Sequence, residues 1–289
     1  MRSHWKKQSL CFLASNMQQL ILPALLASWW TLCSGAEWCY QSQFSCDHPC
    51  NGPEKWNQAN SNCEGKQQSP INIVTRKTLK DERLTPFKFD NYQQIFRGTI
   101  KNNGHSGGSS SPEHVSDGGL PTSYKAVQFH LHWGNNGGPG SEHTIDGEQY
   151  PMELHIVHMK HHYTDLTTAL SDPEGVAVLG FFYEKSNRAN KKYEPIINAL
   201  RSIKNANGNT SLPPVSLAQL IPAEQNLTSY YRYKGSLTTP GCTEAVVWTL
   251  PVQPLNGRQV FRSGGAVILA SSALLMATIA TALGLSQPN

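Results

Sequence analysis

His130 and His132 are separated by a single leucine in an apolar segment of the chain. Residues two apart on an extended strand point to the same face, so both imidazoles can reach one point. A third histidine, His155, lies in a second apolar segment. An adjacent antiparallel strand would bring it to the same point. Three neutral imidazoles with one open position are typical of a catalytic zinc site, because a structural site fills the fourth position with protein.

An isolated His-x-His pair has a plainer interpretation, which is two histidines on a half-exposed strand. The polar neighbours of these histidines favour the metal site instead. Gln128 lies two residues before His130, and Glu153 lies two residues before His155. Each can accept the second ring N–H of its histidine and fix the tautomer, as metal-bound histidines require. The same alternation places His158 on the opposite face from His155.

The elements that position these histidines are predicted to be mainly short strands. Alternating or apolar runs predict strands at 126–133, 152–159, 176–183 and 245–250. Isoleucines and leucines at helical spacing predict a helix within 191–203 that packs on the outside of the sheet. A stretch of glycine and serine at 106–111 predicts a loop, and no internal repeat is present. The fold class is therefore mainly β with peripheral helices.

The first 36 residues are predicted to be a signal peptide. A basic start precedes an apolar stretch at 20–32, which ends in the small residues Ser34-Gly35-Ala36. The alternative is an N-terminal membrane anchor, but Pro23 and several polar residues interrupt the run and make it short for a span. Cleavage after Ala36 is the favoured interpretation.

The other end of the chain is predicted to carry a glycolipid anchor signal. Residues 266–285 are almost wholly apolar, no Lys or Arg follows them, and Ser263 begins a run of three small residues before them. This pattern favours attachment at Ser263 and removal of 264–289. The usual polar spacer is nearly absent, and a retained transmembrane helix is the alternative.

The remaining residues, 37–263, suffice for one domain. The mean hydropathy of -0.42 is consistent with a soluble body between two apolar ends. The net charge of +4 includes the leader, and the basic residues form no long run. Composition therefore gives no reason to expect a nucleic-acid partner.

Cysteines and short acceptor motifs agree with an extracellular protein. Of 7 cysteines, Cys11 and Cys33 leave with the leader, and the five that remain can form disulfides in a secreted context with one thiol left over. Asn209 and Asn226 begin Asn-x-Ser/Thr motifs for glycosylation. Such short motifs also occur by chance in cytosolic chains.

Six segments resemble motifs of the alpha-class carbonic anhydrases, in particular their extracellular, membrane-anchored members. They are spread over most of the mature chain, at 68–73, 102–105, 128–134, 141–147, 153–158 and 235–240. The resemblance implies a single-domain fold around a large, mostly antiparallel sheet. It also implies a lyase that reversibly hydrates carbon dioxide to bicarbonate and a proton, with Zn²⁺ as the cofactor on His130, His132 and His155. Non-catalytic relatives lack one or more of these histidines.

The resemblance further assigns roles to residues that look ordinary by themselves. Thr238, otherwise a turn residue, would accept a hydrogen bond from zinc-bound hydroxide and donate its own to Glu142. His105, otherwise a loop residue, would be the proton shuttle, because imidazole titrates near neutral pH. The backbone carbonyl of Gly257 would accept the second ring N–H of His132.

The resemblance also implies a substrate pocket, water-ordering positions and disulfides. The apolar pocket positions, which would otherwise be taken as core, are Val157, Val178, Leu237, Val246 and Trp248, and the polar positions are Tyr40, Asn103 and Thr239. The implied disulfides are Cys39 with Cys50 and Cys63 with Cys242, which leaves Cys46 free. Sulfonamide inhibitors and a glycolipid-anchored place on the outer face of the plasma membrane follow from the same resemblance.

Two departures from the family pattern carry further expectations. Between Ser106 and His114 a run rich in glycine and serine replaces the strand beside His105, so this strand is expected to be lost or frayed. After Leu250 the chain runs directly into a segment at 251–260 that resembles the closing strand, so a helix and a strand are missing. A splice variant and an imperfect gene model would both produce this.

The shortened C-terminal part leaves other functions open. One alternative is a zinc-binding surface domain with weak or no activity, and another is a variant that folds poorly. A different zinc hydrolase is a more distant alternative, because no motif positions a catalytic base outside the family set.

Overall fold

The computed structural model describes residues 38–40, 50–102, 107–109, 113–134, 138–204 and 208–252. The chain divides into two units, 1–34 and 35–289, and only the second contains described residues. The predicted signal peptide, Cys46, Asn103, His105, Gly257, Ser263 and the apolar tail lie outside the described residues. Within the described ranges, no helix is long and apolar enough to cross a membrane.

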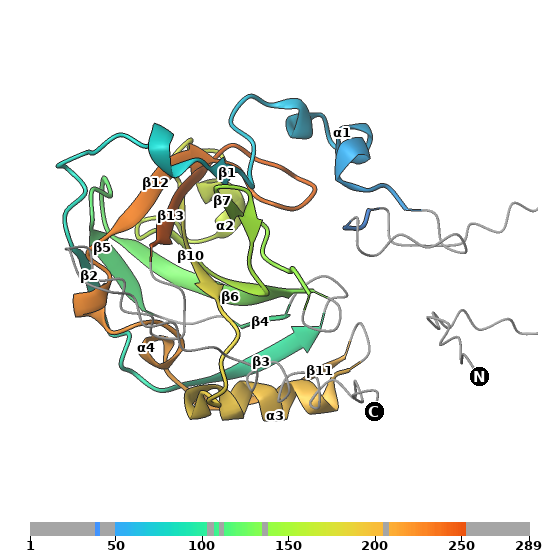
Figure 1. Ribbon diagram of the computed structural model, residues 1–289, viewed down its shortest axis with the longest axis vertical. Helices are drawn as coiled ribbons and strands as arrows, with labels where there is room; N and C mark the ends of the chain where they lie inside the picture. The colour runs from blue at the N-terminus through green and yellow to red at the C-terminus, as the bar shows by residue number, and fades with distance from the viewer. Residues whose placement is uncertain are drawn as a thin grey trace, which may run out of the picture. The chain divides into compact units, whose positions relative to one another are not determined.

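A large mixed sheet dominates the described residues (Figure 1). Its order is β11-β3-β4-β6-β9-β10-β13-β12, with β5 pairing both β6 and β2. The strands are β2 (Phe87–Asp90), β3 (Phe96–Asn102), β4 (Gly107–Ser109), β5 (His114–Asp117), β6 (Tyr124–Trp133), β9 (Met152–Lys160), β10 (Val176–Tyr183), β11 (Asn209–Val215), β12 (Tyr230–Gly235) and β13 (Val246–Pro251). All pairs are antiparallel except β10 with β13. The predicted fold class is confirmed, and the sheet is mixed in this one respect.

The four strands predicted from apolar runs are all present as β6, β9, β10 and β13. Every residue of β10 is buried. Both faces of the sheet are thus covered at β10, which explains why a continuous apolar run forms this strand. A second, small sheet joins β1 (Asn72–Ile73), β7 (Thr144–Ile145) and β8 (Glu148–Gln149).

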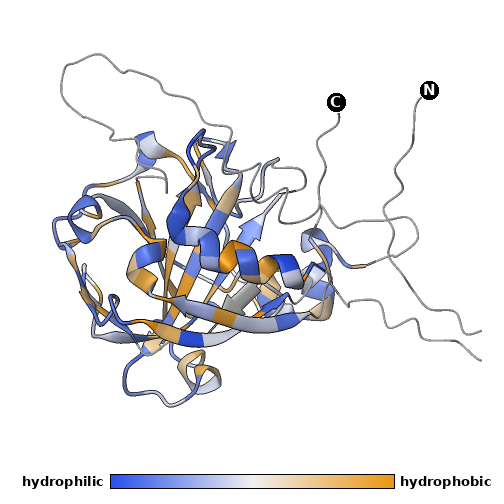
Figure 2. Ribbon diagram, turned by 90° about the horizontal axis from the view of Figure 1, so that it is seen from below, coloured by the Kyte–Doolittle hydropathy of each residue, from blue (hydrophilic) through white to orange (hydrophobic). Residues whose placement is uncertain are grey.

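The helices lie around the sheet and are short. The predicted helix at 191–203 is present as η6 (Lys191–Tyr193) followed by α3 (Glu194–Ser202). Its buried residues Ile196, Ile197 and Ala199 face the sheet, where α3 packs on β11, and hydrophobic and hydrophilic residues alternate along it (Figure 2). The others are η2 (Pro53–Lys55), α1 (Trp56–Ala59), η3 (Ser61–Glu64), η4 (Thr75–Lys77), α2 (Leu166–Ala169), α4 (Leu217–Leu220) and η7 (Glu224–Asn226).

The expectation of a lost strand and a loop after Ser106 is wrong in part. Gly107–Ser109 forms the short strand β4, which pairs with β3 on one side and β6 on the other. The chain then forms β5 from His114. Backbone N–H and C=O groups between two strands must find partners whatever their side chains, so even a glycine-rich segment is held in the ladder.

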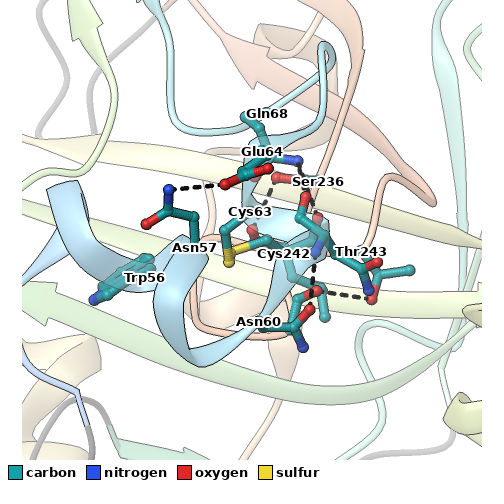
Figure 3. The surroundings of a disulfide bond; sticks show 12 residues. Trp56, Asn57, Asn60, Cys63, Glu64, Gln68, Ser236, Cys242 and Thr243 are labelled. Atoms are coloured by element: carbon teal, nitrogen blue, oxygen red, sulfur yellow. Dashed lines mark hydrogen bonds between the residues drawn. A yellow bond between two sulfur atoms is a disulfide. The ribbon is translucent and has the colours of Figure 1, made fainter. Parts of the chain in front are cut away.

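Both predicted disulfides are confirmed, Cys39 with Cys50 and Cys63 with Cys242. The second joins η3 to the loop that precedes β13 (Figure 3). The second disulfide therefore ties the N-terminal segment to the loop close to Thr238, whereas the first closes a loop within that segment.

Candidate active site

Three histidines converge on one face of the β6–β9 pair. Antiparallel register places His130 opposite His155 and His132 opposite Glu153. His155 Nδ1 lies 3.2 Å from His130 Nε2 and 3.2 Å from His132 Nε2. Two nitrogens bound at about 2.0–2.1 Å to one tetrahedral zinc ion lie about 3.3 Å apart. The spacing therefore fits a single tetrahedral metal ion.

Burial favours the neutral form of two of these imidazoles, His130 and His132. It lowers the pKa of His130 to about 3, with a further contribution from repulsion by His155. Burial also lowers the pKa of His132 well below its ordinary value, again with repulsion from His155. A neutral imidazole has a lone pair for a metal ion, whereas a protonated one has none.

Hydrogen bonds to the second ring nitrogens orient two of the three rings. His130 Nδ1 lies 2.8 Å from Gln128 Oε1, and His155 Nε2 lies 2.7 Å from Glu153 Oε1. Since these oxygens accept the ring N–H groups, the opposite nitrogens carry lone pairs toward the shared point. The acceptor predicted for His132, Gly257, lies outside the described residues.

His143 forms a second polar group with Glu153 and His155 that the sequence did not predict. Its Nδ1 lies 2.7 Å from Glu153 Oε1, and Glu153 Oε2 accepts the backbone N–H groups of Glu142 and His143 at 2.8 and 2.9 Å. Separations of 2.7 Å are hydrogen bonds, shorter than the spacing of two ligands on one zinc ion. The group therefore supports the His155 ring. The sequence signal that could have indicated it is the histidine directly after Glu142.

Glu142 lies beside the converging nitrogens. Its Oε2 is 3.4 Å from His132 Nε2 and 3.8 Å from His155 Nδ1. Burial and repulsion by Glu153 raise the pKa of Glu142 to about 8, while a hydrogen bond from Thr238 opposes the shift. Thr238 is itself buried. The structure thus brings Thr238 and Glu142 into the contact that the resemblance implies.

The apolar pocket positions form one buried cluster beside this site. The cluster contains Val157, Val178, Val246 and Trp248, and Leu237 packs against it. The ring of Trp248 meets His155 edge-on, with centroids 4.8 Å apart. Two polar positions border the same region: Tyr40 meets His132 edge-on at 6.1 Å, and the half-buried Thr239 accepts the backbone N–H of Cys242.

Comparison with known proteins agrees with this site. The family model described as eukaryotic-type carbonic anhydrase matches residues 51–260. The chain belongs to the eukaryotic-type carbonic anhydrases. The matched region contains all three converging histidines together with Glu142 and Thr238.

Several curated relatives are carbonic anhydrases by name. Carbonic anhydrase 4 of Rattus norvegicus is 38% identical over 265 residues, which cover 79% of this chain and 85% of the relative. Carbonic anhydrase 4 of Oryctolagus cuniculus is 43% identical over 221 residues, covering 76% and 70%. Carbonic anhydrase 12 of Homo sapiens is 37% identical over 227 residues, covering 77% and 61%. The resemblance drawn from the motifs is confirmed, and the chain is a carbonic anhydrase.

Proposed function

We propose that this carbonic anhydrase holds one zinc ion on His130, His132 and His155 and hydrates carbon dioxide to bicarbonate and a proton at the outer cell surface. The observation that carries the proposal is the pair of 3.2 Å separations between the three ring nitrogens. Neutral imidazoles at this spacing match the donor set of catalytic zinc sites. Zinc at such a site supplies a nucleophile at neutral pH by lowering the pKa of water, for which carbonic anhydrases are the standard example.

Thr238 orients the attacking oxygen. Its hydroxyl donates its proton to Glu142, so at the site its oxygen can only accept. A nucleophile that donates its O–H to Thr238 has its lone pair directed elsewhere, toward the substrate. Glu142 therefore acts through Thr238, and neither residue needs to bind the metal.

The buried cluster around Trp248 receives carbon dioxide. Val157 and Val178 are opposite each other in the β9–β10 register, and Trp248 is opposite Val178 in β13. These side chains present an apolar wall to a small apolar substrate and exclude water from it. Tyr40, Asn103 and Thr239 order the waters that lead to His105, which passes the product proton to buffer.

Metal content and turnover test the proposal together. The wild-type chain is expected to contain about one zinc ion and to hydrate carbon dioxide, and His132→Ala is expected to lose both. His161→Ala is a matched control, because His161 is exposed at the end of β9. Zinc retained at full stoichiometry in His132→Ala would contradict the assignment of His132 as a zinc ligand. Zinc without turnover in the wild type would favour the alternative, a surface domain weakened by its shortened C-terminal part.

Sulfonamide binding is a second test of the same site. An ionised sulfonamide nitrogen is an anionic donor that can ligate zinc while its N–H donates to Thr238. Binding is expected to vanish when zinc is removed by a chelator. Equal affinity for the zinc-free protein would contradict this part of the proposal.

The cellular location is proposed from the chain ends and the extracellular features together. Two disulfides indicate an oxidising compartment. The glycosylation acceptors Asn209 and Asn226 are both exposed. Together with the apolar tail after Ser263, they support a glycolipid anchor on the outer membrane surface. Phosphatidylinositol-specific phospholipase C is expected to release the protein, and retention after treatment would favour a transmembrane helix.

A further inference from the structure

A chain of hydrogen bonds extends from His155 away from the metal point. Glu153 Oε1 contacts both His155 Nε2 and His143 Nδ1 at 2.7 Å. His143 Nε2 lies 2.6 Å from the hydroxyl of Tyr233, and that hydroxyl lies 2.8 Å from Ser69 Oγ. The chain thus connects a proposed metal ligand on β9 to Tyr233 on β12 and to the segment before β1.

When His143 is neutral, only one assignment of donors and acceptors satisfies every hydrogen bond from Glu153 to Ser69. Glu153 Oε2 accepts two backbone N–H groups and Oε1 lies 2.7 Å from two ring nitrogens, so the carboxylate accepts at all four contacts. His143 Nδ1 then carries the proton and Nε2 accepts. The Tyr233 O–H donates to Nε2, which leaves the Tyr233 oxygen to accept from Ser69.

Ser69 also holds the start of the loop that carries Thr238. Ser69 Oγ accepts the backbone N–H of Ser236 at 3.0 Å, and Ser236 Oγ accepts the backbone N–H of Ser69 at 2.9 Å. The indole N–H of Trp248 donates to the Ser236 carbonyl at 3.0 Å. The Ser69 hydroxyl therefore contacts both Tyr233, which supports His155 through His143, and Ser236, which begins the loop that leads to Thr238.

Two glycines make room for this chain. A Cβ on Gly235 would lie 2.2 Å from Ser69 Oγ and 2.6 Å from the Tyr233 ring. A Cβ on Gly180 would lie 3.2 Å from Glu153 Oε1. The close approach of Ser69 to Tyr233 therefore depends on a residue without a side chain at position 235.

We propose that Tyr233 is a positioning residue for the metal, because its hydroxyl holds His143 and, through His143, the Glu153 carboxylate that orients the ligand His155. Without this hydroxyl, Nε2 of the fully buried His143 accepts no hydrogen bond. Because a buried polar atom without a partner costs free energy, rotation of the ring toward another hydrogen-bond donor becomes favourable. Glu153 then loses one of its four donors. The inference rests on the three-histidine zinc site proposed above.

Tyr233→Phe removes only the hydroxyl and keeps the ring that stacks on Trp248, with an interplanar angle of 6°. The full-length, zinc-loaded variant is expected to release zinc to a chelator about 10-fold faster than the wild type, at the lower end of the effect of direct partners of metal-bound histidines because Tyr233 acts through His143 and Glu153. The rise in Tm that zinc produces is also expected to shrink. Tyr230→Phe is the matched control: its hydroxyl lies on the same strand and donates to the backbone carbonyls of Thr85 and Gly118. This control should lower Tm equally with and without zinc.

Ser69 supplies a second set of variants in case Tyr233→Phe does not fold. Ser69→Ala is expected to accelerate zinc release less than Tyr233→Phe does, and Ser69→Thr, which keeps the hydroxyl, is expected to restore the wild-type rate. Zinc release at the wild-type rate in both Tyr233→Phe and Ser69→Ala, with Tm lowered equally in both metal states, would show a purely structural role and overturn the inference.

The result for the wild type separates this inference from the proposed function. A wild-type chain that binds no zinc overturns both. A wild-type chain that binds zinc and loses it in His132→Ala, while Tyr233→Phe and Ser69→Ala retain it normally, overturns the role of Tyr233 alone.

Discussion

Cys63 and Cys242 are joined by a disulfide across 179 residues of sequence, and Cys242 lies four residues after Thr238. Beside the bridge, Glu244 accepts hydrogen bonds from the Gln67 backbone N–H at 2.7 Å and from Gln68 Nε2 at 2.9 Å. Figure 3 shows the disulfide and Gln68 where η3 meets the loop before β13. The loop that carries Thr238 is thus fastened both covalently and by hydrogen bonds.

Loss of this disulfide is expected to destabilise the protein strongly. The double variant Cys63→Ser/Cys242→Ser should lose about 5 kcal/mol of unfolding free energy, because a long closed loop restricts the unfolded chain most. Cys39→Ser/Cys50→Ser, which opens a loop of 11 residues, should lose about 3 kcal/mol. Urea denaturation measures both. A larger loss in the second variant would contradict the ranking.

Thr238→Val is expected to reduce turnover without loss of metal. Valine keeps the shape of threonine but cannot accept from the nucleophile or donate to Glu142. Removal of one oriented hydrogen bond at a reacting group typically costs about 100-fold in rate. Carbon dioxide hydration and zinc content should be measured together, with Thr243→Val from the same loop as control. A drop in zinc content in Thr238→Val would point to a structural defect instead.

His158 is expected to make stability depend on pH. Burial lowers its pKa in the folded protein to about 4 from an ordinary 6.5, and Tyr92 lies 2.6 Å from its Nε2. Between these values the unfolded chain binds more protons, so stability falls as pH drops from 6.5 toward 4. The full effect is about 3 kcal/mol, of which about 2 kcal/mol falls between pH 7 and pH 5. Comparing His158→Asn with the wild type by denaturation at pH 7 and pH 5 measures it, and His161→Asn is the exposed control. A stability difference between His158→Asn and the wild type that does not change with pH would contradict the assignment.

Glu113→Met is expected to stabilise the protein. The Glu113 side chain is fully buried, and neither carboxylate oxygen has a hydrogen-bond partner among the described residues. A buried polar group without a partner costs about 1–3 kcal/mol, and methionine has a similar length without the polar atoms. Thermal unfolding should show a higher Tm, while Glu148→Met at an exposed position should change it little. A lower Tm for Glu113→Met would show that the carboxylate is stabilising.

Zinc removal is expected to lower Tm markedly, because the metal binds only the folded chain. If the segment after Leu250 lacks a helix and a strand as the motif comparison predicts, this chain should depend on zinc more than a relative that has them. Reinserting the missing helix and strand is expected to raise Tm. Equal melting of the shortened and restored chains would show that the segment is dispensable.

The alternation of residue types along single strands was sufficient to predict which side chains share a face. Period-two spacing places His130 with His132 and with Gln128, and places His158 away from His155, whatever the partner strand is. Continuous apolar runs likewise predicted β10 and β13, because burial of both faces requires apolar residues at every position. The motifs then indicated the family, its histidine ligands and its disulfides.

Only the tertiary structure brings the three histidines and their hydrogen-bond partners together. A shift of one residue in the β6–β9 register would move His155 to the opposite face, and no local signal sets that register. The contacts of His143 with Tyr233 and of Tyr233 with Ser69 join positions 90 and 164 residues apart. The short strand β4 exists because its neighbours on both sides supply backbone partners, although its own composition favours a loop. Long-range pairing of this kind depends on the free energy of the whole sheet, and local residue preferences do not determine it.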